Sequence, residues 1–314
     1  MQRVRVSVII GIGVTAIVAG FQFRSSVASA YQAPERPPIV GLAHVGFFVG
    51  DMEKADEFYG HVLGLAHFDL HKPDGSLFLN YYKVNDHQYV EIYPGLKGDD
   101  MDRLSHIAFE TTDIRKLRGY LAAKGVKVPE ELKPGLDKNL SFSVNDPEGR
   151  RIEFVQYMKG SLHSSKFGQL LPDTRVSSHI IHSGFIVHDR DIEDKFYRDI
   201  LGFRVMWYGG RQDNVLNWVD MRVPDGDDWI EYMLGNNNPT VQTRGVMNHL
   251  ALGVTGIQAP YQQVLDRGYK PAQPPKIGRD GKWQLNLYDP DLTRVEMMEL
   301  KPVETPCCSP MVTR

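Results

Sequence analysis

Hydrophobic positions change period repeatedly along residues 39–300, which predicts short strands that alternate with single helices. Apolar runs at 41–49 and 180–187 end in turn residues, as strands do. After Asp51, by contrast, apolar side chains recur every three or four positions, at Ala55, Phe58, Tyr59, Val62 and Leu63. This spacing predicts a helix that begins after Asp51 and ends at Gly64. Further strand-like runs follow at 77–84, 87–93, 215–223 and 229–234.

The strand and helix pattern recurs because the chain repeats itself at two scales. His-Val-Gly-Phe-Phe-Val at 44–49 returns as His-Ser-Gly-Phe-Ile-Val at 182–187, an offset of 138 positions. Phe-Tyr-Gly-His-Val-Leu-Gly at 58–64 returns at the same offset as Phe-Tyr-Arg-Asp-Ile-Leu-Gly at 196–202. Each half is itself double, so four modules of about 65 residues fill 39–300. Each module reads as a strand, a helix and about three strands.

The repeats also set the expected domain boundaries. We expect a first domain at 39–160, a polar, Ser-rich linker at 161–178 and a second domain at 179–300. A tail follows at 301–314.

The first thirty residues have the pattern of a signal peptide. Arg3 and Arg5 precede an uncharged run at 6–21, and Ala-Ser-Ala at 28–30 is a cleavage site of the A-x-A type. We therefore expect export to the periplasm or beyond, with cleavage after Ala30 and an extended tether at 31–38. The alternative is an uncleaved membrane anchor, because a spanning helix needs only slightly more, roughly 18 apolar residues.

Composition narrows the expected partners. The chain has 314 residues, 42% of them hydrophobic, and 36 Lys plus Arg against 39 Asp plus Glu. This is a globular composition without the basic surplus that a phosphate backbone requires, so we expect no nucleic acid. A small molecule is the expected partner, a membrane only if the N-terminal segment stays uncleaved, and no oligomer is required.

The only two cysteines, Cys307 and Cys308, are adjacent in the tail. Their spacing excludes a zinc site of the cysteine type. We expect an exposed tail, with a disulfide between the two neighbours or an attachment point as the alternative.

Every module carries one histidine in its opening strand and one glutamate in its last strand. The histidines are His44, His106, His182 and His249, and the glutamates are Glu91, Glu153, Glu231 and Glu296. The separations within the modules are 47, 47, 49 and 47 positions. Carboxylates on a buried sheet face are costly unless they are paired or bind a metal, and imidazole with carboxylate suits Zn, Ni, Co, Mn or Fe(II). A divalent metal ion is therefore expected; the alternative is that duplication copied the residues without their function.

Residues two positions from these glutamates share their face of the strand, because side chains alternate with a period of two. Arg151 and Arg294 precede Glu153 and Glu296 in this way. Either guanidinium could bind a substrate carboxylate or pair with the glutamate itself. Tyr89, Tyr93, Trp229 and Met233 share faces with Glu91 and Glu231, and they could line a pocket or pack in the core.

The His-Val-Gly-Phe and His-Ile-Ala-Phe strand starts, the Phe-Tyr helices and the Asp-Pro turns before the last glutamates resemble those of the vicinal oxygen chelate superfamily. That superfamily includes glyoxalase I, extradiol ring-cleaving dioxygenases, metal-dependent fosfomycin-modifying enzymes and methylmalonyl-CoA epimerase. The resemblance covers 39–300 and implies an α+β fold of four βαβββ modules in two tandem halves, paired into cup-shaped mixed sheets. It also implies one metal site per pair of modules, with positions left open for a substrate that chelates through neighbouring oxygens.

Two pairings of the modules are compatible with the spacing. If neighbours pair, one site holds His44, Glu91, His106 and Glu153, and the other holds His182, Glu231, His249 and Glu296. In the crossed arrangement of fused glyoxalases, the first module meets the fourth and the second meets the third. The linker at 161–178 separates the halves and favours neighbours.

The resemblance leaves the reaction open, and other residues bear on it. Ring-cleaving members have a tyrosine before the final ligand, where this chain has Ser143 and Asn286, and their N-terminal half usually lacks ligands. The sequence therefore favours a glyoxalase-like isomerase or lyase in which Glu153 or Glu296 removes a proton next to a carbonyl. An exported protein would rarely meet a cytosolic glutathione hemithioacetal, so that substrate is not carried over. An extradiol-type dioxygenase using Fe(II) and a non-catalytic small-ligand binding protein remain the alternatives.

Overall fold

A computed structural model describes residues 34–312 of the chain. The expected signal peptide, its cleavage site after Ala30 and the start of the expected tether lie outside the described residues. Within them, no helix combines the length and the apolar character that crossing a membrane would demand.

The first half forms a seven-stranded mixed sheet with the strand order β2-β3-β4-β1-β5-β7-β6. Its first module comprises β1 (Ile39–Val49), α1 (Met52–Asp56), the π-helical η1 (Glu57–Val62), β2 (His67–His71), β3 (Leu77–Lys83) and β4 (Tyr89–Pro94). Its second module comprises β5 (Leu104–Thr111), α2 (Ile114–Ala123), β6 (Leu140–Asn145) and β7 (Arg151–Gln156). Within each module the first strand runs parallel to the last, whereas β1 and β5 are antiparallel at the centre.

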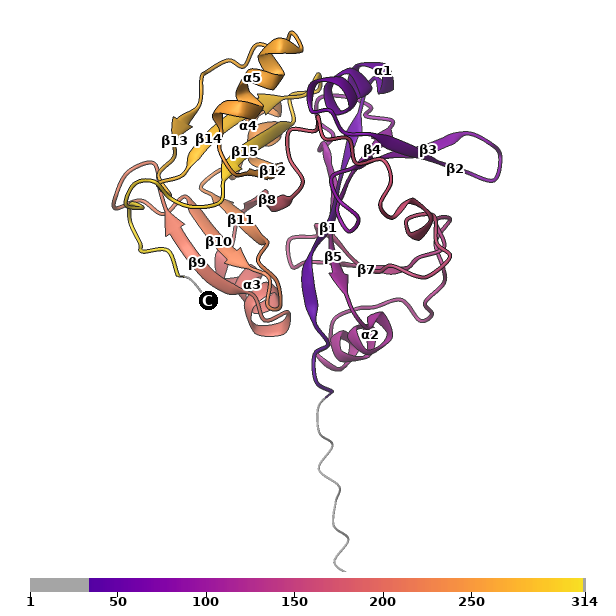
Figure 1. The fold of residues 1–314 in the computed structure, drawn as a ribbon. Helices are drawn as coiled ribbons and strands as arrows, with labels where there is room; N and C mark the ends of the chain where they lie inside the picture. Colours follow the sequence, from indigo (N-terminus) through magenta and orange to yellow (C-terminus); the bar gives the residue numbers. More distant parts are fainter. Residues whose placement is uncertain (1–33, 313–314) are drawn as a thin grey trace, which may run out of the picture. The chain divides into compact units, whose positions relative to one another are not determined.

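The second half repeats this plan in an eight-stranded sheet with the order β13-β14-β15-β12-β8-β11-β10-β9. The third module comprises β8 (Ile180–Val187), α3 (Arg190–Asp194), η3 (Lys195–Ile200), β9 (Arg204–Gly209), β10 (Trp218–Arg222) and β11 (Trp229–Leu234). The fourth comprises α4 (Val241–Met247), β12 (His249–Val254), α5 (Gln258–Asp266), β13 (Lys276–Ile277), β14 (Trp283–Tyr288) and β15 (Arg294–Glu299). Figure 1 shows the two sheets, the first from indigo to magenta and the second from rose through orange to yellow.

The predicted α+β fold of tandem halves is confirmed, and neighbouring modules share a sheet. One detail of the prediction is wrong: the second module has one strand fewer than the βαβββ plan. Between α2 and β6 it has only an isolated bridge from Pro134 to Leu140. Pro129 and Pro134 lie in this stretch, and a proline has no N–H to give to a sheet.

The first Phe-Tyr helix begins and ends as its sequence predicts, and the second has equivalent ends. The side chain of Asp51 accepts hydrogen bonds from the backbone N–H groups of Glu53 and Lys54, and Asp189 caps α3 in the same way. Gly64 and Gly202 follow the helices at φ angles of 69° and 85°, a region that glycine enters without steric cost. Between these ends the helices change from α to π geometry, and Tyr59 and Tyr197 are completely buried there.

The two tyrosines join the halves crosswise. The hydroxyl of Tyr59 in the first module donates to Asp289 of the fourth at 3.0 Å, and that of Tyr197 in the third donates to Asp146 of the second at 3.1 Å. Both acceptors belong to the Asp-Pro turns. The backbone repeats the exchange, since Gly50 N–H donates to Asp291 and His188 N–H to Glu148. Neighbours therefore share a sheet, while the first module contacts the fourth and the third contacts the second.

Candidate metal centres

Four adjacent strands of the first sheet place one set of side chains on the same face. Gly46 of β1 lies opposite both Glu91 and His106, and Glu153 lies opposite Ala108. Residues opposite one another on neighbouring strands share a face, as do residues two positions apart. The first set therefore consists of His44, Glu91, His106 and Glu153.

The polar atoms of the first set converge. The Nε2 atoms of His44 and His106 are 3.0 Å apart. The Glu91 carboxylate lies 3.4 and 3.5 Å from the two Nε2 atoms, and that of Glu153 lies 4.0 and 3.9 Å from them. All four residues are buried.

The second sheet reproduces this arrangement with the same register. Gly184 lies opposite both Glu231 and His249, and Ala251 lies opposite Glu296. The second set consists of His182, Glu231, His249 and Glu296. Its Nε2 atoms are 3.1 Å apart, and its carboxylates lie 3.3 to 3.9 Å from them. The structure thus brings together all eight predicted residues, as two sets within neighbouring modules and not as crossed sets.

Two glycines make room for the histidines. A Cβ atom on Gly46 would lie 2.6 Å from the His106 ring, and one on Gly184 would lie 1.9 Å from the His249 ring. Such distances are shorter than any side chain tolerates, so glycine is required there. The recurrent glycine two residues after His44 and His182 was the sequence signal for this role.

The electrostatics of the sets suit a cation. Burial lowers the pKa of His44 to about 3 and lowers the pKa of the other three histidines well below its usual value, so their imidazoles are neutral. Burial, with Glu153 nearby, raises the pKa of Glu91 to about 8. It also raises the pKa of Glu231 and of Glu296 to about 7. Neutral imidazole nitrogens and buried carboxylates that lack a full counter-charge fit a divalent metal ion.

One histidine of each set is oriented by a partner on its outer nitrogen. The Nδ1–H of His249 donates to the carbonyl of Met247 at 2.8 Å, and Nδ1 of His106 is 3.1 Å from the Ser105 hydroxyl. A carbonyl only accepts, so His249 directs the Nε2 lone pair into its set. Nδ1 of His44 and of His182 is buried without a hydrogen-bond partner in the described structure.

The two predicted arginines occupy equivalent positions but contact different atoms. Arg151 donates to Glu153 at 2.7 Å and to the Ser143 hydroxyl at 2.8 Å, and its side chain is 47% exposed. Arg294 is only 12% exposed and donates to Nε2 of His249 at 2.7 Å. A guanidinium therefore uses an imidazole lone pair in the second set, whereas in the first set it uses a carboxylate lone pair.

A cavity opens over each set. The first cavity has a volume of about 150 Å³, and its walls include Tyr93, Tyr157 and Arg151. The second cavity has a volume of about 170 Å³ and is lined by Met233, Arg294 and the stacked rings of Trp207 and Trp218, among others.

Tyr89 and Trp229, the other two expected substrate-binding residues, are not on the cavity walls. Tyr89 is fully buried and its hydroxyl donates to the carbonyl of Asp86. The rings of Trp229 and His182 pack with their centroids 4.9 Å apart, and the Lys282 ammonium nitrogen lies 4.6 Å from the centroid of the Trp229 ring. Any effect of either residue on a ligand would act through the side chains that it contacts.

Several cavity residues were not foreseen, and His163 and Asp220 show two different reasons. His163 comes from the stretch expected to be a linker, where η2 (Ser164–Lys166) forms, and it lines the first cavity against Tyr81 and Tyr157. The internal repeat could not reveal His163, because the tail after the second half has no equivalent histidine. Asp220 lines the second cavity and lies opposite Glu231 on the neighbouring strand. The alternation of side chains along its strand could therefore have predicted that it shares the face of the second set.

A sequence profile of the Glyoxalase/Bleomycin resistance protein/Dioxygenase superfamily matches residues 41–154 and 179–297. Among individual proteins, glyoxalase I of Saccharomyces cerevisiae is 29% identical over 101 residues, which cover 32% of this chain and 28% of the yeast protein. A Synechocystis protein named probable lactoylglutathione lyase is 32% identical over 126 residues, 37% of this chain and 94% of its own length.

Solved structures of similar fold include ring-cleaving dioxygenases. An extradiol dioxygenase from B. fuscum has a TM-score of 0.63 at 18% identity, over 89% of this chain and 76% of its own. A substrate complex of homoprotocatechuate 2,3-dioxygenase from Brevibacterium fuscum has a TM-score of 0.59 at 19% identity, over 89% and 86%. At these identities the likeness concerns the fold alone.

Proposed function

Because this chain belongs to the Glyoxalase/Bleomycin resistance protein/Dioxygenase superfamily, we propose that it is a metal-dependent isomerase or lyase. Its substrate is a small molecule that chelates the metal through two adjacent oxygens. The observation that carries the proposal is the convergence of two imidazole Nε2 atoms and two carboxylates in each half.

The donor set fits Zn, Ni, Co, Mn or Fe(II). The first set and the second set would each hold one ion, and such an ion would act as a Lewis acid that polarises the substrate oxygens. Glu153 and Glu296 lie on the last strand of their halves, next to an arginine on the same face. We assign them the transfer of a proton at the carbon beside the substrate carbonyl.

The cavities support a small substrate. At about 150 and 170 Å³, both are well below the roughly 300–1,000 Å³ of sites for drug-sized ligands. Arg294 and Arg151 lie on the cavity walls, where a guanidinium can bind a carboxylate. The proposal therefore favours a short hydroxy- or oxo-acid over a glutathione conjugate.

Solvent deuterium exchange tests the proton chemistry. The metal-loaded protein is incubated in heavy water with short α-hydroxy carbonyl compounds, and proton NMR follows the C–H next to the carbonyl. We expect exchange with the wild-type protein, and its loss in a variant with both Glu153→Gln and Glu296→Gln. The amide keeps an oxygen ligand, so metal content should largely persist, whereas His106→Ala with His249→Ala should lower metal content itself. Exchange that survives in the double glutamine variant would refute the assigned roles.

An extradiol-type dioxygenase is the second candidate, and one observation favours it. His44, His106 and Glu153, and likewise His182, His249 and Glu296, form groups whose ligand atoms all lie within 4.8 Å of one another. Two histidines and one carboxylate are the ligand set of non-haem Fe(II) oxygenases. Oxygen uptake with catechols after anaerobic loading with Fe(II), without deuterium exchange, would establish this function instead. Metal and ligand binding with neither activity would indicate a binding protein.

We also propose that the protein is exported. The charged start, the apolar run and the A-x-A site support this, and a disulfide between the two cysteines agrees with an oxidising compartment. N-terminal sequencing of protein from its own host should begin at Tyr31. An intact N-terminus in a membrane fraction would instead show an uncleaved anchor.

A further inference from the structure

The C-terminal segment 302–312 returns from β15 and is bonded to the edge of the second sheet (Figure 1). Ser309 Oγ bonds to both the N–H and the carbonyl of Tyr208 at 3.0 Å, and Val312 N–H donates to the carbonyl of Met206 at 2.7 Å. Val303 N–H donates to the carbonyl of Gly281 at 2.8 Å. The tail is mostly exposed, as expected, but these contacts fix it against β9 and the 278–281 turn.

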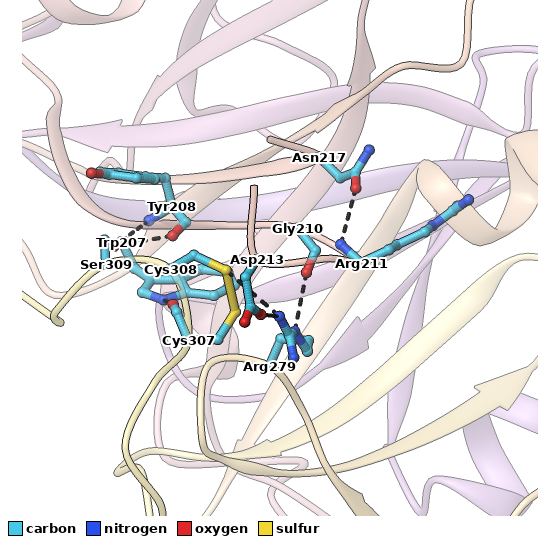
Figure 2. Close-up of a disulfide and its surroundings, with 10 residues drawn as sticks. All are labelled: Trp207, Tyr208, Gly210, Arg211, Asp213, Asn217, Arg279, Cys307, Cys308 and Ser309. Carbon is cyan, nitrogen blue, oxygen red and sulfur yellow. Dashed lines mark hydrogen bonds and ion pairs between the residues drawn. A yellow bond between two sulfur atoms is a disulfide. The ribbon is translucent and has the colours of Figure 1, made fainter. Parts of the chain in front are cut away.

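Cys307 and Cys308 form a disulfide within this segment. Figure 2 shows that the pair lies beside two large side chains, Trp207 of β9 and Arg279 of the 278–281 turn. The indole N–H of Trp207 donates to the Cys307 carbonyl at 3.2 Å, and Nη2 of Arg279 lies 3.8 Å from the Cys308 sulfur. The same Arg279 is held by Asp213 and by the carbonyl of Gly210.

The contacts of the disulfide are also walls of the second cavity. Trp207 and Arg279 both line it, as does Arg211, whose N–H is bonded to Asn217 in the same turn. In the first half, the segment after the last strand contributes Tyr157 and His163 to the first cavity. In the second half the chain beyond the final strand supplies no wall residue itself and instead contacts the wall residues Trp207 and Arg279 through the disulfide.

This disulfide has little to contribute to global stability. A cross-link stabilises mainly by closing a loop in the unfolded chain, and the effect grows with the length of that loop. Here the two cysteines are neighbours in the sequence. What the bond does restrain is the local backbone, because Cys308 has a φ of 72°. Residues other than glycine rarely adopt this region.

We propose that Cys307–Cys308 is a reversible dithiol/disulfide site that controls the outer wall of the second cavity. The co-reactant is a dithiol reductant. Its thiolate attacks Cys307 Sγ, the S–S bond breaks, and Cys308 leaves as a thiolate beside the Arg279 guanidinium, which favours the leaving group. The second thiol of the reductant then attacks the mixed disulfide and releases Cys307. The reductant ends as its own disulfide. One of its two protons passes to Cys307 and the other to solvent, and Cys308 stays a thiolate beside Arg279.

Opening the bond changes the wall through two contacts. Cys308 no longer has to keep its left-handed backbone, so the Cys307 carbonyl can turn away from the Trp207 indole. Arg279 meets a negative sulfur in place of a neutral one, which competes with its bonds to Asp213 and Gly210. Both changes act on residues 204–213 and 279–281, at the mouth of the second cavity.

Hydrogen–deuterium exchange of the full chain, with and without dithiothreitol, tests the proposal, and alkylation with mass analysis counts the free thiols. We expect two thiols to appear together with faster exchange at 204–213, 279–281 and 303–312. Exchange at β4 and β7 of the first half should not change and provides the internal control. A variant with both Cys307→Ser and Cys308→Ser should exchange fast at these segments whether or not the reductant is present.

Several outcomes would overturn the proposal. One is a protein whose two cysteines open fully while exchange at 204–213 and 279–281 stays as it was. Another is a bond that dithiothreitol does not reduce in the folded protein. A third is a double-serine variant with the slow exchange of the oxidised protein. The wild-type measurement stands by itself if that variant fails to fold.

Discussion

At the scale of single residues, Gly184 decides whether the His249 ring can occupy its place in the second set. In the Gly184→Ala variant the methyl group would lie 1.9 Å from that ring, so we expect the imidazole to move and the second set to lose its metal. Metal content per chain, measured by mass spectrometry after saturation, should fall by the equivalent of one site.

A matched variant separates this effect from general damage. Gly119 lies in α2, and apart from its chain neighbours and its own helix no atom lies within 4 Å of its Cβ position. Gly119→Ala should keep the full metal content and stabilise the protein by about 0.5–1 kcal/mol, as helical alanine does relative to glycine. Full metal content in a folded Gly184→Ala variant would show that the second set does not depend on this space.

Arg294 leads to a second residue-scale prediction, because its guanidinium is bonded to Nε2 of His249. Metal binding has to break this bond, and a hydrogen bond to a charged group contributes about 1.5–3 kcal/mol. Arg294→Met should therefore raise the metal affinity of the second set by about tenfold or more. Competition with a chromogenic chelator measures it, in a background where His44→Ala and His106→Ala disable the first set.

Arg151→Met provides the comparison in the first set. Arg151 contacts the Glu153 carboxylate and the Ser143 hydroxyl and is half exposed, so no guanidinium is bonded to an imidazole of the first set. We expect a clearly smaller gain in affinity. Equal gains in the two sets would mean that the bond to His249 is not what limits the second set.

These residues also show what could be predicted from sequence. All eight set members could be predicted, because the repeats align them and strand parity gives their face. Parity gives only a face, however, so it left open whether Arg151 and Arg294 contact glutamate, histidine or substrate. Arg151 and Arg294 both lie two positions before a glutamate, but they contact different partners because their burial differs. The Arg151 side chain is 47% exposed and that of Arg294 is 12% exposed. His163 could not be predicted, since nothing in the second half repeats it.

At the scale of elements, the Asp-Pro turn before β15 carries a pH-dependent contribution to stability. Burial raises the pKa of Asp289 from 3.8 to about 6. Between these values the folded protein holds a proton that the unfolded chain has released, so the free energy of unfolding falls as pH rises through this window. A shift of this size corresponds to about 3 kcal/mol. The hydrogen bond from Tyr59 does not offset it fully.

Asp289→Asn should remove this contribution, because the amide does not ionise and can still accept from Tyr59. Urea unfolding at several pH values checks it. We expect the stability of the variant relative to wild type to increase as pH rises from 4 to 6. Asp173→Asn, a substitution at an exposed position of the linker, should leave the pH profile unchanged. A constant difference between Asp289→Asn and wild type would refute the assignment.

Elements were predicted best where local signals were strong. The helix that begins after Asp51 and the strands at 180–187 and 229–234 were correctly placed. The strand expected at 215–223 is shorter, Trp218–Arg222, because residues 210–217 fold into a tight turn. A Cβ atom on Gly210 would lie 1.5 Å from the carbonyl oxygen of Val215. The apolar residues Val215 and Leu216 lie in that turn, and they extended the predicted strand beyond its true start.

At the scale of the whole molecule, the halves share one hydrophobic core that includes Phe109 and Phe203, 5.2 Å apart. A fragment of residues 34–160 would expose its part of that core and leave Tyr59 without Asp289. We expect this fragment not to persist as a folded monomer. Where it does fold, it should dimerise, with Tyr59 of each copy bonded to Asp146 of the other. Sedimentation velocity over a range of concentrations measures this, and a stable folded monomer would contradict it.

The crosswise Tyr–Asp contacts also bear on the ancestry of the chain. Tyr59 of the first half bonds to Asp289 of the second, and the equivalent Tyr197 of the second half bonds to the equivalent Asp146 of the first. Such reciprocal contacts between equivalent residues are the pattern of a two-fold symmetric dimer interface. A gene fusion that joined two such subunits would make their association independent of concentration. It would also remove the requirement that both subunits stay identical, because each half is then encoded by a separate part of the gene and can mutate independently. The two halves could then diverge, which accounts for a buried arginine and a cysteine pair in only one of them.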